Sequence, residues 1–116
     1  MNAVTAVSGS GPAYYYYFTE AIVEAGKRAG LSPGYATLLA KQTALGAARM
    51  MLESHDEPSM LRDKVTSPNG TTYAALQSMR SSQVFEHIVE AVLAACRRSE
   101  QLGAENQTRG EEQVSG

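Results

Sequence analysis

The sequence predicts an all-α domain, and three observations support that prediction. Apolar residues recur at three- and four-residue spacing along several segments, as they do on one face of a helix. Alanine occupies 17 of the 116 positions, and such small residues favour closely packed helices. No segment after residue 7 reads convincingly as a strand. A chain of this length forms one domain.

The first half of the chain contains two predicted long helices. Residues 3–7 are either extended or the start of a helix. Ser10 is a suitable cap and Pro12 suits a first turn, so we predict a helix over about 12–29 that stops at Gly30. Ser32 and Pro33 repeat the start signal and predict a second helix over 33–53.

The second half contains a short helix over 59–65, a polar stretch over 66–72, and two further helices. One begins near Thr71 and is broken at Ser81 and Ser82, and the last covers about 83–102. The last helix carries the broadest apolar stripe: Val84, Phe85, Ile88, Val89, Val92, Leu93 and Cys96. Residues 103–116 are polar and without periodicity, which predicts a disordered tail behind a domain of residues 1–102.

The lengths of these helices suggest a dimer. Each long helix would measure about 27–30 Å, as much as the diameter of so small a globule, whose radius of gyration is near 13 Å. Such helices with broad apolar faces are expected to bury part of their surface against a second chain.

Charge and composition exclude several classes of function. The net charge is −2, and the tail alone holds three acidic residues and one basic residue, so residues 1–102 are formally neutral. A neutral body offers no footprint for nucleic acid, which argues against a helical DNA-binding dimer. No apolar run is long enough to cross a membrane, and the start does not resemble a secretory signal. The single Cys96 cannot form an internal disulfide and fits the reducing cytoplasm.

Some apparent motifs fail on detail. The segment 9–11, Gly-Ser-Gly, is not a dinucleotide loop because Tyr14 stands at the third glycine position and no βαβ pattern follows. The chain therefore has no predicted cofactor-binding residues of its own. His55 and His87 have no partner at metal-ligand spacing, so no metal site is predicted.

The polar stretch 66–72, Thr-Ser-Pro-Asn-Gly-Thr-Thr, is the best functional candidate. It places hydroxyls and unpaired backbone N–H groups at the start of a helix, where an anion is attracted. A carboxylate is as suitable as a phosphate. The alternative is an elaborate helix cap that binds no ligand.

Four segments, in this order and spacing, resemble one family. They cover residues 3–14, 42–50, 61–72 and 85–99, and the loop Val-Thr-Ser-Pro-Asn-Gly-Thr-Thr of residues 65–72 is the most specific. The chain resembles the C-terminal dimerisation domain of pyrroline-5-carboxylate reductase. That family reduces 1-pyrroline-5-carboxylate to L-proline with NADPH or NADH, the last step of proline biosynthesis.

The resemblance implies a fold, an assembly and a set of site residues. The fold would be a helical bundle like the C-terminal domain of 6-phosphogluconate dehydrogenase, interlocked as a homodimer, with larger assemblies of dimers known in the family. Ser67 and the backbone N–H groups of Gly70 and Thr71 would hold the substrate carboxylate. Thr72 would hydrogen-bond the ring nitrogen and help deliver its proton.

Two departures from the family pattern affect this reading. Asn69 stands where the family usually has a glycine, and asparagine is the next best residue if that position needs a positive φ. The family's N-terminal Rossmann domain, which binds the cofactor, has no counterpart before Met1. We therefore expect the chain by itself to be inactive. The alternative is a stand-alone helical dimerisation module without chemistry.

Overall fold

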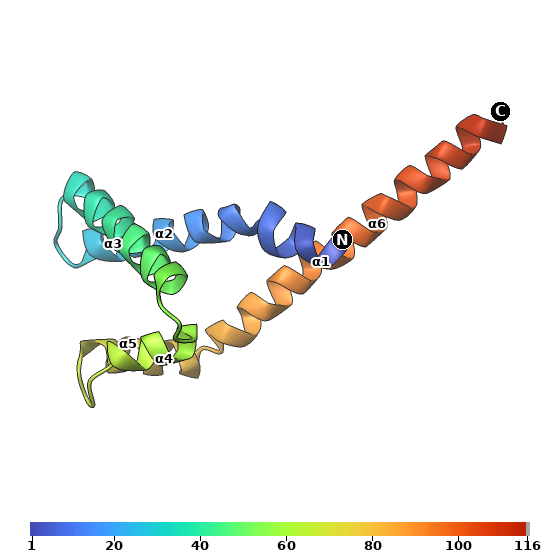
Figure 1. The fold of residues 1–116 in the computed structure, drawn as a ribbon. Helices are drawn as coiled ribbons and strands as arrows, with labels where there is room; N and C mark the ends of the chain where they lie inside the picture. Colours follow the sequence, from blue (N-terminus) through green and yellow to red (C-terminus); the bar gives the residue numbers. More distant parts are fainter. Residues whose placement is uncertain (116) are drawn as a thin grey trace. The chain divides into compact units, whose positions relative to one another are not determined.

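A computed structural model describes the backbone of residues 1–115 and the side chains of residues 1–107. Every regular element in that part of the chain is helical (Figure 1), which confirms the all-α prediction. The chain divides into two compact units. The central unit is Tyr15–Ser82, and the terminal unit joins Met1–Tyr14 to the chain from Gln83 onward.

The terminal unit is built on α6 (Val84–Ser115), with α1 (Asn2–Val4) and the π-helix η1 (Thr5–Gly9) packed along it. The Ser99 hydroxyl donates to Asn2 Oδ1 at 2.7 Å, which ties the N-terminus to α6. The Tyr14 hydroxyl, in the first turn of α2 (Gly11–Arg28), donates to the Ala6 carbonyl at 2.7 Å. Residues 3–7 are thus the start of a helix, one of the two possibilities left open above.

The π-helix has a local cause in Pro12. Proline has no N–H to donate to the carbonyl four residues earlier, and its ring clashes with that carbonyl. The helical turn before the proline includes one more residue than an α-helical turn. Its Ser10 N–H donates to the Thr5 carbonyl, five residues earlier, at 2.8 Å. Ser10 therefore ends η1 in a helical conformation instead of capping a separate helix.

In the central unit, α2 and α3 (Pro33–Glu53) form a hairpin whose turn carries the predicted signals. Gly30 has φ +111°, and Gly30 N–H and Leu31 N–H donate to the carbonyls of Lys27 and Gly26, the Schellman pattern of a helix end. The Ser32 hydroxyl oxygen accepts from Tyr35 N–H at 3.2 Å and caps α3. Both helix-end predictions are confirmed.

The hairpin closes through small residues. A Cβ placed on Gly26 would lie 3.2 Å from the Ala36 Cβ, so the glycine lets α3 approach α2 closely. Ala36 and Ala40 are buried beside it. The rest of the unit is α4 (Pro58–Lys64), which an ion pair between Lys64 and Asp56 ties to the preceding loop, and α5 (Thr71–Ser81).

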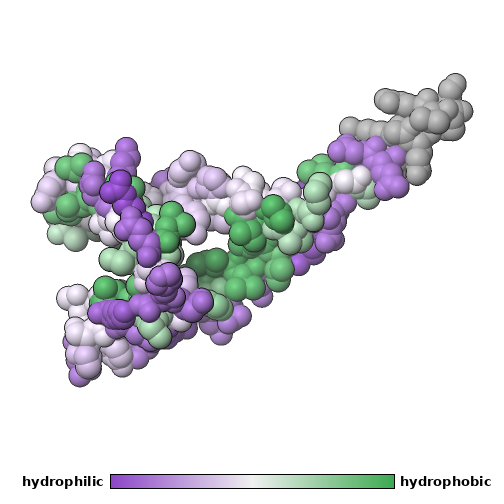
Figure 2. Space-filling model, in the orientation of Figure 1, coloured by the Kyte–Doolittle hydropathy of each residue, from purple (hydrophilic) through white to green (hydrophobic). Residues whose placement is uncertain are grey.

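Among the described side chains, the only buried hydrophobic residues are three alanines, Ala6, Ala36 and Ala40. Large apolar side chains remain exposed instead, and Figure 2 shows them gathered along the first half of α6. Phe85 is 72% exposed and Ile88 is 51% exposed. An exposed apolar face of this kind is typical of an interaction surface.

The helix α6 does not end near Leu102. It continues to Ser115, so the described part of the segment predicted to be a disordered tail, 103–116, is helical. Nothing after Leu102 forces a stop, because Gly103 costs a helix only about 1 kcal/mol and the next residues are mostly good helix formers. Arg98 and Glu105 form an ion pair at 3.7 Å across the predicted boundary. Gly116 lies outside the described residues.

Candidate functional site

The polar stretch between α4 and α5 begins with an anchor at Thr66. The Thr66 hydroxyl donates to the Arg62 carbonyl at 2.6 Å, and its backbone N–H donates to the Asp63 carbonyl at 3.1 Å. A helix leaves its last four carbonyls without helical partners. One half-buried residue therefore satisfies two carbonyls at the end of α4 and fixes where the loop starts.

The next four residues form a tight turn. Gly70 N–H donates to the Ser67 carbonyl at 3.1 Å, and Asn69 has φ +60°. Pro68 at the second position and a positive φ at the third are features of a type II turn. Asn69 is thus in the left-handed conformation that the sequence comparison with the family suggested for this position.

Gly70 has a steric reason to be glycine. Its φ of −86° is open to any residue, but a Cβ there would lie 2.5 Å from the Ser67 hydroxyl oxygen. Real Cβ atoms do not approach an oxygen so closely. The missing side chain thus leaves the Ser67 hydroxyl room beside the start of α5.

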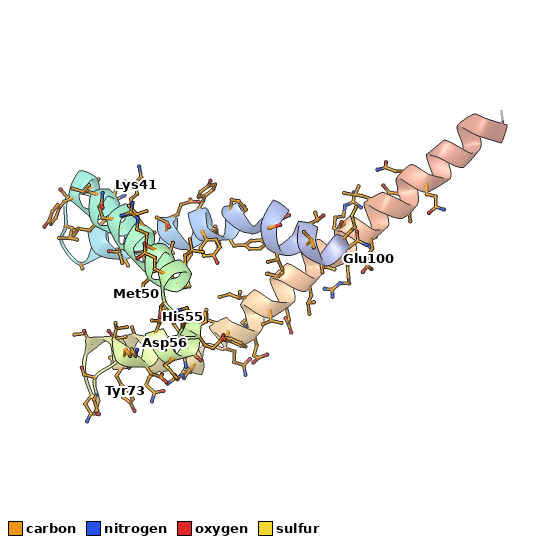
Figure 3. The ribbon with its side chains drawn as sticks, in the orientation of Figure 1. Lys41, Met50, His55, Asp56, Tyr73 and Glu100 are labelled. Atoms are coloured by element: carbon orange, nitrogen blue, oxygen red, sulfur yellow. The ribbon has the colours of Figure 1, made fainter. Side chains whose placement is uncertain are left out.

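The start of α5 has no side-chain cap. Gly70 is its N-cap residue and has no side chain to offer, whereas Ser32 caps α3. The backbone N–H groups of Thr71, Thr72 and Tyr73 have no hydrogen-bond partner among the described residues. Figure 3 shows Tyr73 on α5 just after the loop. Three free N–H groups and the positive end of the helix dipole suit an anion.

The structure places all four predicted site residues within this one segment of the central unit. Ser67 and Thr71 are exposed, and Gly70 and Thr72 are half-buried. The hydroxyls of Thr71 and Thr72 have no hydrogen-bond partner among the described residues. The N–H of Gly70 is already donated within the turn, so a ligand would have to share or replace that bond.

Two features of the segment escaped the sequence reasoning. Tyr73 contributes a third free N–H, which its place as the third residue of a helix could have indicated. The anchoring role of Thr66 was also missed, although a threonine shortly after a helix end is a possible partner for the last carbonyls.

The other candidate motifs belong to other segments of the chain. Gly9 ends the π-helix and Gly11 begins α2, so the segment between them is part of a helical run and not a phosphate-binding loop. His87 faces Glu90 at 3.9 Å. The described residues contain no group of three potential metal ligands. Within the same part of the chain, no helix is both long and apolar enough to cross a membrane.

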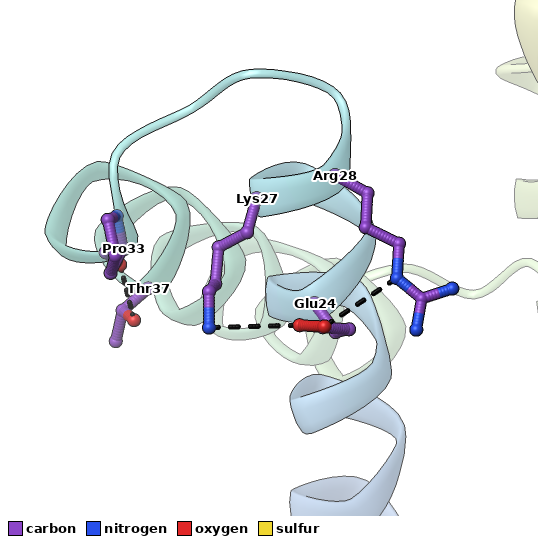
Figure 4. A network of polar contacts seen from close by, with 5 residues as sticks. All are labelled: Glu24, Lys27, Arg28, Pro33 and Thr37. Atoms are coloured by element: carbon purple, nitrogen blue, oxygen red, sulfur yellow. Dashed lines mark hydrogen bonds and ion pairs between the residues drawn. The ribbon is translucent and has the colours of Figure 1, made fainter.

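A groove of about 680 Å³ lies between α2 and α3. Two acidic residues line it, Glu20 and Glu24, and Glu24 pairs with Lys27 at 3.7 Å and with Arg28 at 3.6 Å (Figure 4).

Comparison with known proteins identifies the family. The model of the family described as pyrroline-5-carboxylate reductase dimerisation matches residues 1–102. The pyrroline-5-carboxylate reductase of Pseudomonas aeruginosa is 53% identical over 88% of this chain and 37% of its own length. The enzyme of Synechocystis is 48% identical over 89% of this chain and 39% of its own length.

Solved structures give the same result. The Plasmodium falciparum pyrroline carboxylate reductase with NADP bound superposes with a TM-score of 0.85 at 37% identity, over 89% of this chain and 42% of that one. The Coxiella burnetii pyrroline-5-carboxylate reductase gives a TM-score of 0.83 at 44% identity, over 87% and 37%. This chain thus spans well under half the length of these relatives. It belongs to the pyrroline-5-carboxylate reductase dimerisation family.

Proposed function

We propose that this chain is the dimerisation and substrate-binding part of a reductase that converts 1-pyrroline-5-carboxylate to L-proline. The observation that carries the proposal is the uncapped start of α5, with three free N–H groups beside the Thr72 hydroxyl, in a chain of this family. The chain's own glycine-rich segment is helical and does not suit a dinucleotide. NADPH or NADH would therefore be held by a separate domain, and the chain by itself would be inactive.

The geometry suggests a division of roles among the loop residues. The substrate carboxylate would accept from the N–H groups of Thr71 and its neighbours in the first turn and from the Ser67 hydroxyl. The Gly70 N–H would join them if its bond to the Ser67 carbonyl opens. In this substrate the ring nitrogen is bonded to the carbon that bears the carboxylate, so a carboxylate held at the helix start brings the nitrogen towards Thr72.

Thr72 is the proposed catalytic residue. The reduced nicotinamide supplies a hydride to the imine carbon, and the π electrons of the C=N bond become a lone pair on the ring nitrogen, which takes up a proton. The Thr72 hydroxyl, which is half-buried and has no partner among the described residues, can hydrogen-bond that nitrogen and help deliver the proton.

The assembly we propose is an interlocked homodimer, with larger assemblies of dimers possible for the complete protein. The exposed apolar face of α6 supports this proposal. The free, half-buried thiol of Cys96 is compatible with the reducing cytoplasm, which is the compartment that we propose.

The test uses a complete reductase in which the dinucleotide-binding domain of the Pseudomonas aeruginosa relative precedes this chain. Thr72→Val keeps the side chain's shape and removes its hydrogen bond. Losing one positioned donor costs about 1–3 kcal/mol, or about fivefold to 150-fold in kcat/KM for pyrroline-5-carboxylate. Thr72→Ser, which keeps the hydroxyl, should retain most of the activity.

Stability must be measured on the same variants. The thermal midpoint and the oligomeric state of Thr72→Val should stay close to those of the parent, because valine fills the same volume. An unchanged kcat/KM would show that Thr72 is only a residue of the helix start, and the proposal would be wrong. A loss of activity that comes with unfolding would equally remove the evidence for a catalytic role.

A further inference from the structure

We propose that Thr66 is a positioning residue for the carboxylate-binding start of α5. The inference rests on the proposed function and deepens it, because Thr66 touches neither the substrate nor the cofactor in that scheme. It would act by fixing the backbone from which Ser67 and the first-turn N–H groups are presented.

The anchor is a pair of hydrogen bonds from one residue. The Thr66 hydroxyl reaches the Arg62 carbonyl at 2.6 Å, and its N–H reaches the Asp63 carbonyl at 3.1 Å. The Val65 N–H also donates to Arg62, at 3.2 Å, so the end of α4 keeps a partner for that carbonyl if the hydroxyl is removed. Loss of the hydroxyl should therefore loosen the loop more than it harms the helix.

The segment that follows Thr66 is stiff, so a displacement of Thr66 also displaces the residues after it. Pro68 has a fixed φ, Asn69 is held in the left-handed region, and the Gly70 N–H closes the turn on Ser67. Only four residues separate Thr66 from Thr71, the first residue of α5. Because this turn is short and rigid, the position of Thr66 determines where the N–H groups at the start of α5 lie.

The expected kinetic effect follows from what those N–H groups bind. The carboxylate is not the reacting group, and its contacts are equally strong in the ground state and in the transition state. Weakening such uniform binding raises KM and leaves kcat nearly unchanged. Thr66 should therefore affect the KM for pyrroline-5-carboxylate and spare the KM for NADPH.

The experiment compares three variants of the complete reductase described above. Thr66→Val removes the hydroxyl and keeps the branched shape, and Thr66→Ser restores the hydroxyl. Thr37→Val is the matched control, because the Thr37 hydroxyl makes the same kind of bond, to the Pro33 carbonyl at 2.8 Å, on α3 (Figure 4). All three are measured for kcat, for both KM values and for thermal midpoint.

We expect Thr66→Val to raise the KM for pyrroline-5-carboxylate about three- to tenfold, the usual effect of losing one hydrogen bond, with kcat changed less than twofold. Thr66→Ser should lie near the parent, and Thr37→Val should leave both KM values unchanged. A Thr66→Val enzyme with an unchanged KM would overturn the inference. So would a rise in KM that Thr37→Val reproduces, because that rise would reflect general loosening.

The same set separates this inference from the proposed function. If Thr72→Val lowers kcat/KM while Thr66→Val has no effect, the proposed function stands and the positioning role fails. If Thr72→Val has no effect, the catalytic role of Thr72 fails, and a rise in the KM for pyrroline-5-carboxylate in Thr66→Val that is absent in Thr66→Ser and Thr37→Val would still support the positioning role.

Discussion

Replacing Ile88 by alanine tests whether the exposed face of α6 is a dimer interface. Ile88 lies on the apolar stripe and is 51% exposed, although full burial of such a side chain contributes about 1.5–3 kcal/mol. About half of that contribution, or about 1 kcal/mol, is left for a partner to supply. A twofold dimer uses the site twice, so Ile88→Ala should weaken dimerisation by about 2 kcal/mol, or about thirtyfold in Kd.

The assay is light scattering after gel filtration, repeated over a range of protein concentrations. The parent chain should be a dimer at micromolar concentration, and Ile88→Ala should dissociate at concentrations where the parent does not. Glu90→Ala is the matched control, because Glu90 belongs to the polar side of the same helix and its carboxylate contacts only His87 among the described residues. Its Kd should stay within a factor of two or so of the parent value.

Two results would refute the reasoning. A parent chain that remains a monomer at every concentration would mean that the apolar face is not covered by a second copy. Equal effects of Ile88→Ala and Glu90→Ala would mean that the stripe is not the contact surface. The thermal midpoint gives an independent check, since the stability of a dimer depends on protein concentration and that of a monomer does not.

Two further predictions concern stability and are measured by denaturant unfolding. Asn69→Ala should lower the free energy of unfolding by about 1 kcal/mol, because φ at Asn69 is +60°. Asn69→Gly should be neutral or slightly stabilising. Equal stabilities of the two variants would contradict the left-handed turn. Gly26→Val should lower the free energy of unfolding by about 1–3 kcal/mol, because a Cβ at Gly26 would lie 3.2 Å from the Ala36 Cβ. A variant as stable as the parent would mean that α2 and α3 do not approach so closely.

A helix end could be predicted from the sequence where that end carries a local signal. The α3 helix covers the predicted residues 33–53, and its start is specified by Ser32 and Pro33 through contacts between residues that are close in the sequence. The end of α2 was predictable from Gly30 for the same reason. Capping and turn chemistry act between neighbouring residues, so they can be deduced without knowledge of the tertiary structure.

The sequence reasoning failed where no local signal exists. Nothing ends α6 after Leu102, so polar composition was a poor guide and the helix continues past Gly103. The π-helix before Pro12 could not be distinguished from an α-helix, because the two differ in the register of their backbone hydrogen bonds, five residues apart instead of four. Both cases depend on backbone geometry that side-chain periodicity does not report.

The sequence could predict where the candidate site lies, but not which of its hydrogen-bond donors are free. A hydroxyl-rich helix start indicates an anion, yet only the structure shows that the N–H of Gly70 closes a turn while those of Thr71 to Tyr73 stay free. The substrate itself came from resemblance, since a carboxylate and a phosphate suit such a helix end equally well.

The structure also separates residues that build the loop from residues that are left over for function. The hydroxyl of Thr66 is used by α4, Asn69 is needed for its positive φ, and the absence of a side chain at Gly70 leaves the Ser67 hydroxyl its present position. Each of these has a task in building the loop. The hydroxyls of Thr71 and Thr72 have no hydrogen-bond partner among the described residues and remain open to solvent. No contact within the fold uses the hydroxyl of Thr72, the more enclosed of the two, which leaves it available to bind a substrate atom.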